Sequence, residues 1–402
     1  MPDAPAPSTP PPPLDEAGAG DGWIVLKFLL HAVAGVFRAR VLLLAAAGVL
    51  AAELGVLACF LFQPNQAARV ELLSPTVAAG PVDAGELLRE AWAGQAGYWQ
   101  AFVAPFWTRA ATSADGFQQG LAGVVRLIVW SLFGVAIARI AALHLTHHEP
   151  PSMATTLRRS TSGWIGQAAG PLVPLAVVGV SAGLVHMLGG MSRLWPIGMA
   201  VALLWPLLAL LAAAAGVLAI GVAFGFPLML ASQSVERRDP FDAVSCGFAY
   251  VYQRPLRLAA YTAQALAVGA AAGAVVLLAV RVSDSVLVGW FEGLGYAFDD
   301  GGHLYGPGSG PSVVASIARF WHNLFLCLPA VFYAAYFWFA ATAVYLLLRR
   351  DIDEKPSDEV HLDEAPAPDE AAAPAGAAEQ PTQAPPPGEP PPQGAPPPSA
   401  EA

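Results

Sequence analysis

The sequence predicts an all-α, polytopic membrane protein with six transmembrane helices, and three observations support this fold class. Of the 402 residues, 55% are hydrophobic and 12% are charged, whereas an average soluble domain carries about 25% charged residues. So few charged side chains cannot coat a water-soluble globule, which excludes an ordinary cytosolic enzyme. Six stretches are long and apolar enough to cross a bilayer as helices. The alternating ten-residue segments of a membrane barrel are absent from the sequence.

Each predicted span carries about 20 or more mostly apolar residues in a row, the length that a bilayer core of about 30 Å requires. Helix is the expected structure because backbone polar groups in lipid must bond within their own segment. The fourth and sixth stretches exceed the minimum length, so they are expected to tilt or to extend past the bilayer. The six predicted spans are residues 42–63, 120–143, 165–188, 196–230, 257–281 and 317–348.

Both ends of the chain differ from this apolar body. Residues 1–14 hold seven prolines, and residues 351–402 hold fourteen prolines, twelve acidic residues and one lysine. Such segments have little apolar surface to bury, so we expect disordered, proline-rich tails at 1–22 and 351–402 around a membrane domain at 23–350. The tails are either solvated spacers or ligands for a protein partner with a proline-binding groove. The net charge of −10 belongs to the C-terminal tail.

Lysine and arginine residues lie mostly on one side of the predicted spans. With a cytoplasmic N-terminus, twelve of them face the cytoplasm, five face the outside and three fall within spans. The positive-inside rule therefore predicts a protein of a bacterial cytoplasmic (inner) membrane with both termini in the cytoplasm. Arginines near the inner ends of the spans are expected to contact the anionic leaflet. They are Arg158, Arg159, Arg237, Arg238, Arg254 and Arg257.

A short amphipathic segment precedes each odd-numbered span, at residues 23–40, 152–164 and 239–254. The third is the best defined, because Asp239 suits a helix N-cap and Pro240 suits the first helical position. A partly apolar helix flanked by arginines fits the interface of an anionic leaflet. The sequence therefore predicts three two-helix repeats, each preceded by a cytoplasmic interfacial helix.

Two further features bear on the spans. The outer connection at residues 64–119 is long, and the sequence leaves open whether it folds or re-enters the membrane. Prolines interrupt several spans and predict kinks, because proline lacks the backbone N–H and clashes with the preceding turn. These prolines are Pro171, Pro174, Pro206, Pro227 and Pro329.

The stretch "ASQSVERRDPFDAVSCGFAYVYQRPLRL" at residues 231–258 resembles the cytoplasmic loop of bacterial six-span membrane proteins of unknown function. A similar arrangement occurs in the membrane domain attached to some bacterial glycerophosphodiester phosphodiesterases. "ARIAAL" at 138–143 and "PLVPL" at 171–175 also resemble the first group. The resemblance covers about residues 120–350 and implies a six-span module. It does not imply phosphodiesterase activity, because both tails are too short and too low in complexity to form that domain.

Ionisable residues inside spans point to function, because a charge is costly in lipid and usually faces a partner or a cavity. Glu53 lies near the middle of the first span and Arg126 lies inside the second, at depths that a long arginine can match. We therefore expect an ion pair between them. A second hypothesis is an outward polar vestibule, with snorkelling to the outer interface as the alternative. The residues of this vestibule are Arg126, His186, Arg319, His322 and Asn323.

Three other motifs are expected to be structural. The G-x-S-x-G pattern around Ser181 lies mid-span, whereas a nucleophile elbow needs a strand-to-helix turn. A polar cluster at the end of the second span consists of His144, His147, His148 and Glu149. It lacks an accompanying metal motif, and we expect it to lie at the interface. The outer loop that contains Asp299, Asp300 and His303 is expected to be a turn. No catalytic residue, metal or cofactor is expected.

The sequence thus predicts a non-enzymatic, multi-pass membrane protein. Its leading role is a scaffold or accessory protein that uses the tails and the inner interfacial helices to bind partners or anionic lipid. The alternative is a small-solute or lipid permease that uses the outward vestibule. A weaker alternative is an intramembrane hydrolase. Substrate, partner and oligomeric state do not follow from the sequence, and no nucleic acid is expected as a partner.

Overall fold

The computed structural model describes residues 21–60, 83–107, 113–148, 152–293, 297–298, 304–305 and 313–353. The chain divides into two units, residues 1–361 and 362–402, and every described residue belongs to the first. Most of both proline-rich tails therefore lies outside the described residues, as do Asp299, Asp300 and His303.

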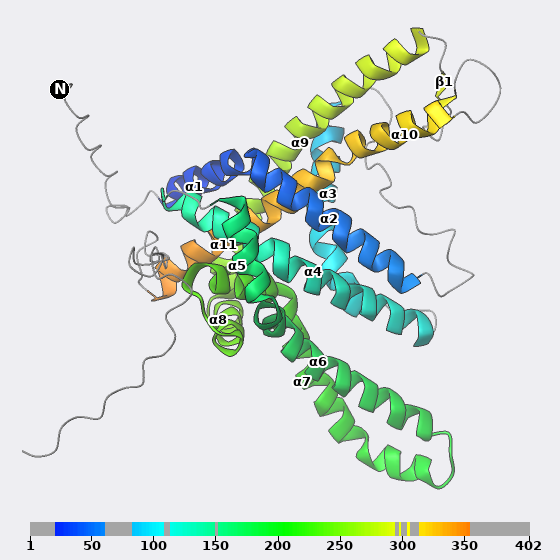
Figure 1. The fold of residues 1–402 in the computed structure, drawn as a ribbon. Helices are drawn as coiled ribbons and strands as arrows, with labels where there is room; N and C mark the ends of the chain where they lie inside the picture. The colour runs from blue at the N-terminus through cyan, green and yellow to red at the C-terminus, as the bar shows by residue number, and fades with distance from the viewer. Residues whose placement is uncertain are drawn as a thin grey trace, which may run out of the picture. The chain divides into compact units, whose positions relative to one another are not determined.

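The described residues are helical apart from one pair of two-residue strands (Figure 1). In the strand pair, β1 (Ala297–Phe298) runs antiparallel to β2 (Leu304–Tyr305). The helices are α1 (Asp21–Val36), α2 (Ala39–Phe60), α3 (Ala84–Trp107), α4 (Ser113–Leu145), α5 (Met153–Ser162), α6 (Trp164–Met191), α7 (Ile197–Glu236), α8 (Pro240–Gln253), α9 (Pro255–Gly293), α10 (Val313–Leu326) and α11 (Leu328–Asp353).

Within the described residues, six helical segments are long and apolar enough to cross a membrane, which confirms the predicted all-α, six-span fold class. These segments are Ala39–Cys59, Gly116–Leu145, Trp164–Met191, Ile197–Glu236, Pro255–Gly293 and Phe320–Asp353. Most of them run several residues past the predicted limits, because polar residues at the ends continue the helical backbone beyond the apolar core of each span.

The helix order follows the predicted threefold pattern. The short helices α1, α5 and α8 precede the span pairs α2 and α4, α6 and α7, and α9 and α11, respectively. The two spans of each pair pack against one another. Asp239 caps α8 as expected, accepting a 2.8 Å hydrogen bond from the backbone N–H of Asp242, and Pro240 occupies the first turn.

The core of the bundle is built around α11, which packs against α1, α2, α4, α7 and α9. Tyr336 and Trp338 on this helix are fully buried. The Trp338 ring stacks on that of Trp130 in α4, with 6.0 Å between centroids. The Tyr336 hydroxyl donates a 2.7 Å hydrogen bond to the backbone carbonyl of Ala265 in α9. Large aromatic side chains on one central helix therefore pack against and hydrogen-bond the neighbouring spans.

Helix α3 shows that part of the connection at residues 64–119 folds. It packs against α4, α9 and α11 rather than lying apart from the spans. Its Glu90 forms an ion pair with Arg281 of α9, and its Tyr98 accepts a 3.3 Å hydrogen bond from the Trp338 indole. The span pattern missed this helix because its first turns carry Glu86 and Glu90 among the apolar residues.

The sixth predicted span is two helices instead of one. Helix α10 ends at Leu326 and α11 begins at Leu328. Pro329 lies in the first turn of α11, where its missing N–H costs no intrahelical hydrogen bond. The kink predicted at this proline is therefore a helix boundary.

Candidate anion-binding site

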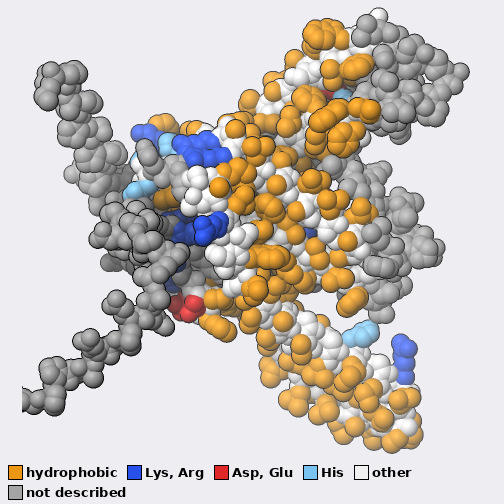
Figure 2. All heavy atoms as spheres, viewed as in Figure 1, with side chains coloured by type: hydrophobic (Ala, Val, Ile, Leu, Met, Phe, Trp, Pro, Cys, Tyr) orange, Lys and Arg blue, Asp and Glu red, His pale blue; other side chains and the backbone are white. Residues whose placement is uncertain are grey.

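Basic side chains gather at one end of the bundle. Figure 2 shows that the Lys and Arg side chains on this face lie mostly at the end that carries α1 and α5, whereas hydrophobic side chains cover the spans. We call this the basic end, meaning the end of the spans at which α1, α5 and α8 lie. The apolar cover beyond it is consistent with contact between the spans and a lipid bilayer.

A cavity of about 280 Å³ opens at the basic end, between α4, α5, α6, α7 and α8. Its size lies near the lower limit for small-molecule sites. Four of its lining residues are arginines, and none of the described lining residues is acidic. The lining residues are Val135, Arg139, Thr156, Arg159, Ser160, Ser162, Gly163, Gly166, Gln167, Gln233, Ser234, Arg237, Arg238 and Pro240.

Arg139 supplies the deepest positive charge of the cavity. Arg139 is only 6% exposed. Its Nη1 donates a 3.1 Å hydrogen bond to the backbone carbonyl of Ser234 in α7. This bond directs the guanidinium across the α4–α7 interface and into the cavity wall.

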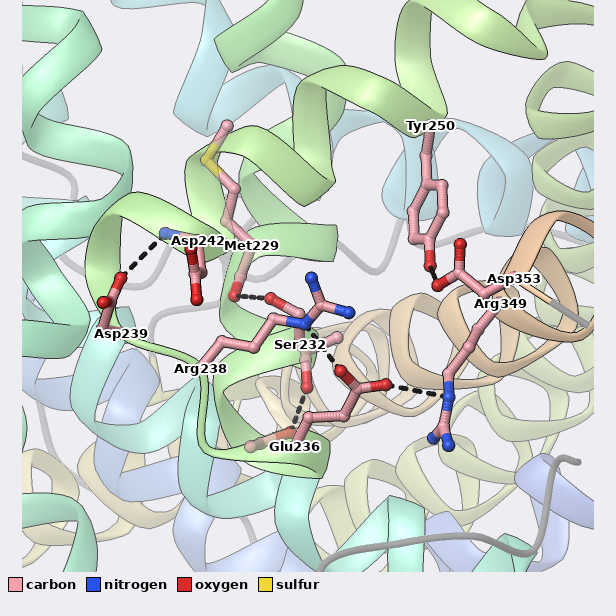
Figure 3. A network of polar contacts seen from close by, with 11 residues as sticks. Met229, Ser232, Glu236, Arg238, Asp239, Asp242, Tyr250, Arg349 and Asp353 are labelled. Atoms are coloured by element: carbon pink, nitrogen blue, oxygen red, sulfur yellow. Dashed lines mark hydrogen bonds and ion pairs between the residues drawn. The ribbon is translucent and has the colours of Figure 1, made fainter. Parts of the chain in front are cut away.

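Arg238 is held by an ion-pair chain at the turn between α7 and α8 (Figure 3). Its Nε lies 2.6 Å from Oε2 of Glu236, and Oε1 of Glu236 lies 2.8 Å from Nε of Arg349. Burial lowers the pKa of Arg238, but the hydrogen bond to Glu236 together with the electrostatic effects of Cys246, Tyr345 and Glu236 outweighs burial, so that the pKa lies above the usual value. Arg238 therefore carries a positive charge at every physiological pH.

Arg237 lies at the same turn, in the left-handed region with φ of 55° and ψ of 35°. A non-glycine residue reaches this region at a cost of about 1–2 kcal/mol. The conformation ends α7 and places Arg237 beside Arg238 on the wall of the cavity.

Two helices begin at the cavity. Helix α6 starts at Trp164, and its N-cap residue Gly163 offers no side-chain hydrogen bond to the first turn. Gly163, Gly166 and Gln167 line the cavity, as does Pro240 at the start of α8. The positive end of the α6 dipole therefore adds to the field of the arginines, because helix N-termini favour anions. The N-terminus of α8 is already capped by the Asp239 carboxylate.

Gln233 adds a neutral donor from α7. Its side chain is 8% exposed, and its Nε2 has no hydrogen-bond partner among the described residues. A Cβ at Gly170 of α6 would lie 2.6 Å from this nitrogen, so glycine leaves the space that the amide occupies. A buried amide donor without a partner costs about 1–3 kcal/mol, which a bound acceptor would offset.

The cavity is suited to an oxyanion that has several acceptor oxygens. Guanidinium groups bind phosphate and carboxylate through paired N–H donors, and the Gln233 amide and the first turn of α6 supply neutral donors. Of the six arginines predicted as leaflet contacts, Arg159, Arg237 and Arg238 line this cavity. The sequence did not single out Gln233, because nothing in its spacing indicates which side chains converge.

The other three predicted leaflet contacts lie elsewhere at the basic end. Arg158 and Arg254 are exposed. Arg257 forms a 2.9 Å ion pair with Asp351 of α11. These arginines lie outside the cavity.

The structure brings together the pair predicted within the spans. Arg126 Nη2 lies 3.6 Å from Glu53 Oε1, with 21% and 37% of the two side chains exposed. The Nη1 of Arg126 also donates a 3.4 Å hydrogen bond to the backbone carbonyl of Ala101 in α3. The pair therefore connects α2, α4 and α3.

The residues of the predicted outward vestibule lie in separate places. Arg126 belongs to the pair just described, and His186 lines a groove between α6 and α7. His322 Nε2 lies 2.6 Å from Asp284 Oδ1 of α9, with Asn323 beside it in α10. The side chain of Arg319 lies outside the described residues. The described members therefore do not share one vestibule.

The remaining motifs have structural roles in the described residues. Ser181 lies within α6 and donates a 2.8 Å hydrogen bond to the Val177 carbonyl, so it is not on a nucleophile elbow. The His144 ring stacks on His31 of α1, with 4.5 Å between centroids, and His148 Nδ1 lies 2.9 Å from the Thr146 hydroxyl. No group of three His, Cys, Asp or Glu residues in the described part of the chain is placed to hold a metal.

No family model, curated protein or solved structure matches the chain. The resemblance to the membrane domain of bacterial glycerophosphodiester phosphodiesterases therefore stays a prediction from the sequence.

Proposed function

We propose that the chain is a non-enzymatic accessory or scaffold protein of a bacterial cytoplasmic membrane that binds the phosphate group of an anionic lipid at its basic end. The observation that carries the proposal is the convergence of four arginines on one cavity with the donor amide of Gln233. The cavity lies where α4 and α7 end, which is the depth expected for a headgroup.

The proposal includes an orientation with both termini in the cytoplasm. The arginines of the basic end support it, because positive charge is retained on the cytoplasmic side of bacterial membrane proteins. Anionic lipids in that leaflet would supply the ligand. In this orientation the proline-rich tails extend into the cytoplasm, where they would engage a protein partner.

Lipid binding is tested by titrating the full-length protein in neutral nanodiscs with dioctanoylphosphatidic acid. Dioctanoylphosphatidylcholine and inorganic phosphate serve as parallel ligands. Replacing Arg159 by Gln removes one guanidinium from the cavity, and the matched change Arg158→Gln alters its exposed neighbour on α5. A charged hydrogen bond contributes about 1.5–3 kcal/mol, so we expect R159Q to weaken binding of phosphatidic acid by about tenfold or more and R158Q by less than about twofold.

Equal losses in the two variants would contradict the proposal, since they would indicate a general surface charge effect. Equal affinity for phosphatidylcholine would also contradict it. Inorganic phosphate that competes at the affinity of the lipid would instead identify a soluble phosphate as the ligand and reject the lipid.

The accessory role of the tail is tested separately. A protein that lacks residues 356–402 is expected not to complement a strain from which the whole gene has been removed. Its affinity for phosphatidic acid is expected to be unchanged. Full complementation by the truncated protein would reject a role for the C-terminal tail.

The permease alternative predicts the opposite pattern, with tail deletion tolerated and Arg126→Ala inactive. No observation on the described residues favours it, because the described residues predicted to line its vestibule are spread over separate places.

A further inference from the structure

A second cavity lies on the other side of α7, within the spans. Its volume is about 290 Å³, and it is formed by α7, α9 and α11 with α3 across one end. Most of its surface is apolar or aromatic, and it shares no lining residue with the arginine cavity. The main lining groups are Trp99, Phe224, Leu266, Tyr336, Phe337 and Val344.

The cavity lies within one half of the apolar spans. At about 1.5 Å per residue, Leu258 is about 5 Å and Leu266 about 17 Å from the start of α9, and both line the cavity. Half of a bilayer core measures about 15 Å. The cavity therefore extends from near the interface to near the middle of the hydrocarbon layer.

The side of the cavity is accessible. Phe224 of α7 and Thr262 of α9 line it from opposite walls, and both are exposed. In a membrane these positions face lipid, so a ligand dissolved in the bilayer could enter between α7 and α9.

The wall of the cavity that α3 forms carries an amide oxygen without a hydrogen-bond partner among the described residues. Gln95 of α3 lines the cavity and is 2% exposed, and its Oε1 has no hydrogen-bond partner in the described part of the chain. The other buried polar lining group, the Tyr336 hydroxyl, already donates to the Ala265 carbonyl. A polar group left without a partner in this apolar setting is costly.

The lining also excludes a charged head. Apart from the Tyr336 hydroxyl, no described lining side chain is ionisable, so a phosphate or ammonium group would lose its hydration without gaining a counter-charge. Aromatic walls instead favour a hydrocarbon chain or a flat ring. The unpartnered Oε1 of Gln95 can only accept a hydrogen bond, so a hydroxyl on the ligand would satisfy it and a carbonyl would not.

We propose that this cavity binds an uncharged membrane-soluble amphiphile, a hydrocarbon body with one hydroxyl head that donates a hydrogen bond to Oε1 of Gln95. This site is independent of the arginine cavity, because it lies on different walls of α7 and selects neutral heads instead of anionic ones.

The test uses full-length protein in phosphatidylcholine nanodiscs. The ligand probe is dioctanoylglycerol, which has a hydroxyl donor, and the comparison probe is a decyl-substituted benzoquinone, which has only carbonyl acceptors. Binding is measured by native mass spectrometry and by the shift in thermal unfolding. The variant Gln95→Leu keeps the volume and removes the amide. Gln118→Leu on α4, which does not line the cavity, is the matched control, and Ala341→Phe fills the cavity from α11.

We expect saturable binding of dioctanoylglycerol and weaker binding of the benzoquinone, which cannot donate a hydrogen bond to Gln95. A lost hydrogen bond weakens binding by about three- to tenfold, so Q95L should show this loss while Q118L does not, and A341F should abolish binding. Without ligand, Q95L should unfold at the same temperature as the original protein or higher, because an unpartnered buried amide has been removed.

Three results would overturn the proposal. The first is no saturable binding of dioctanoylglycerol. The second is unchanged probe binding in both Q95L and A341F. The third is displacement of the probes by dioctanoylphosphatidylcholine at equal concentration, which would show that the cavity holds only the acyl chains of bulk lipid.

Discussion

The ion pair between Glu53 and Arg126 allows a quantitative test of the packing within the membrane. Its two charged groups come from α2 and α4 and lie 3.6 Å apart. At an effective dielectric constant of about 20, this separation corresponds to about 4–5 kcal/mol of attraction. Because the side chains are 37% and 21% exposed, desolvation and screening reduce the expected coupling to about 1–3 kcal/mol.

The measurement is a double-mutant cycle on Glu53→Gln and Arg126→Gln. Each single variant leaves one charge within the spans without its partner, which is costly in lipid. The double variant leaves neither, so it should lose less stability than the sum of the two single losses. Unfolding in mixed micelles, with increasing denaturing detergent, gives the three free energies of unfolding.

Additive losses would refute this reasoning. They would mean that each charge is solvated independently, by water or by lipid headgroups, and that proximity does not couple the two. A coupling above the expected range would instead indicate that the third contact, from Arg126 to the Ala101 carbonyl, depends on Glu53.

Two further predictions concern packing and pH. Gly134→Ala places a Cβ 2.6 Å from the Trp338 ring and should lower the free energy of unfolding by about 1–3 kcal/mol, whereas Gly120→Ala on the same helix meets open space and should be neutral or stabilising. Thermal unfolding measures both, and equal effects would contradict the packing of α4 on α11. Burial and the neighbouring His147 lower the pKa of His31 below 6.5 in the folded state. Unfolding therefore takes up a proton as pH falls below about 6.5, and stability declines there. His31→Gln should flatten this decline, and an unchanged pH profile would reject it.

The sequence predicted the spans well because the signal is local. Long apolar runs define α2 and α7, and the Asp239–Pro240 pair defines the start of α8. The sequence did not predict helix α3, because polar residues in its first turns lower the hydropathy of the segment. Its contacts with α4, α9 and α11 are tertiary, and a hydropathy pattern does not report such contacts.

The candidate site was predicted only in part for the same reason. The sequence placed Arg159, Arg237 and Arg238 near one surface. It could not show that Arg139 turns inward to the Ser234 carbonyl, or that Gln233 lies against Gly170. Convergence of side chains from five helices depends on helix packing, which no short motif encodes.

The most direct test of the proposed function is native mass spectrometry of the protein released from nanodiscs that contain equal amounts of phosphatidic acid and phosphatidylcholine. We expect the original protein and the Arg158→Gln variant to retain one phosphatidic acid molecule. The variant that combines Arg159→Gln with Gln233→Leu should lose it. Retention of both lipids in equal amounts, or a retained phosphatidic acid that survives the combined substitution, would contradict the proposed function.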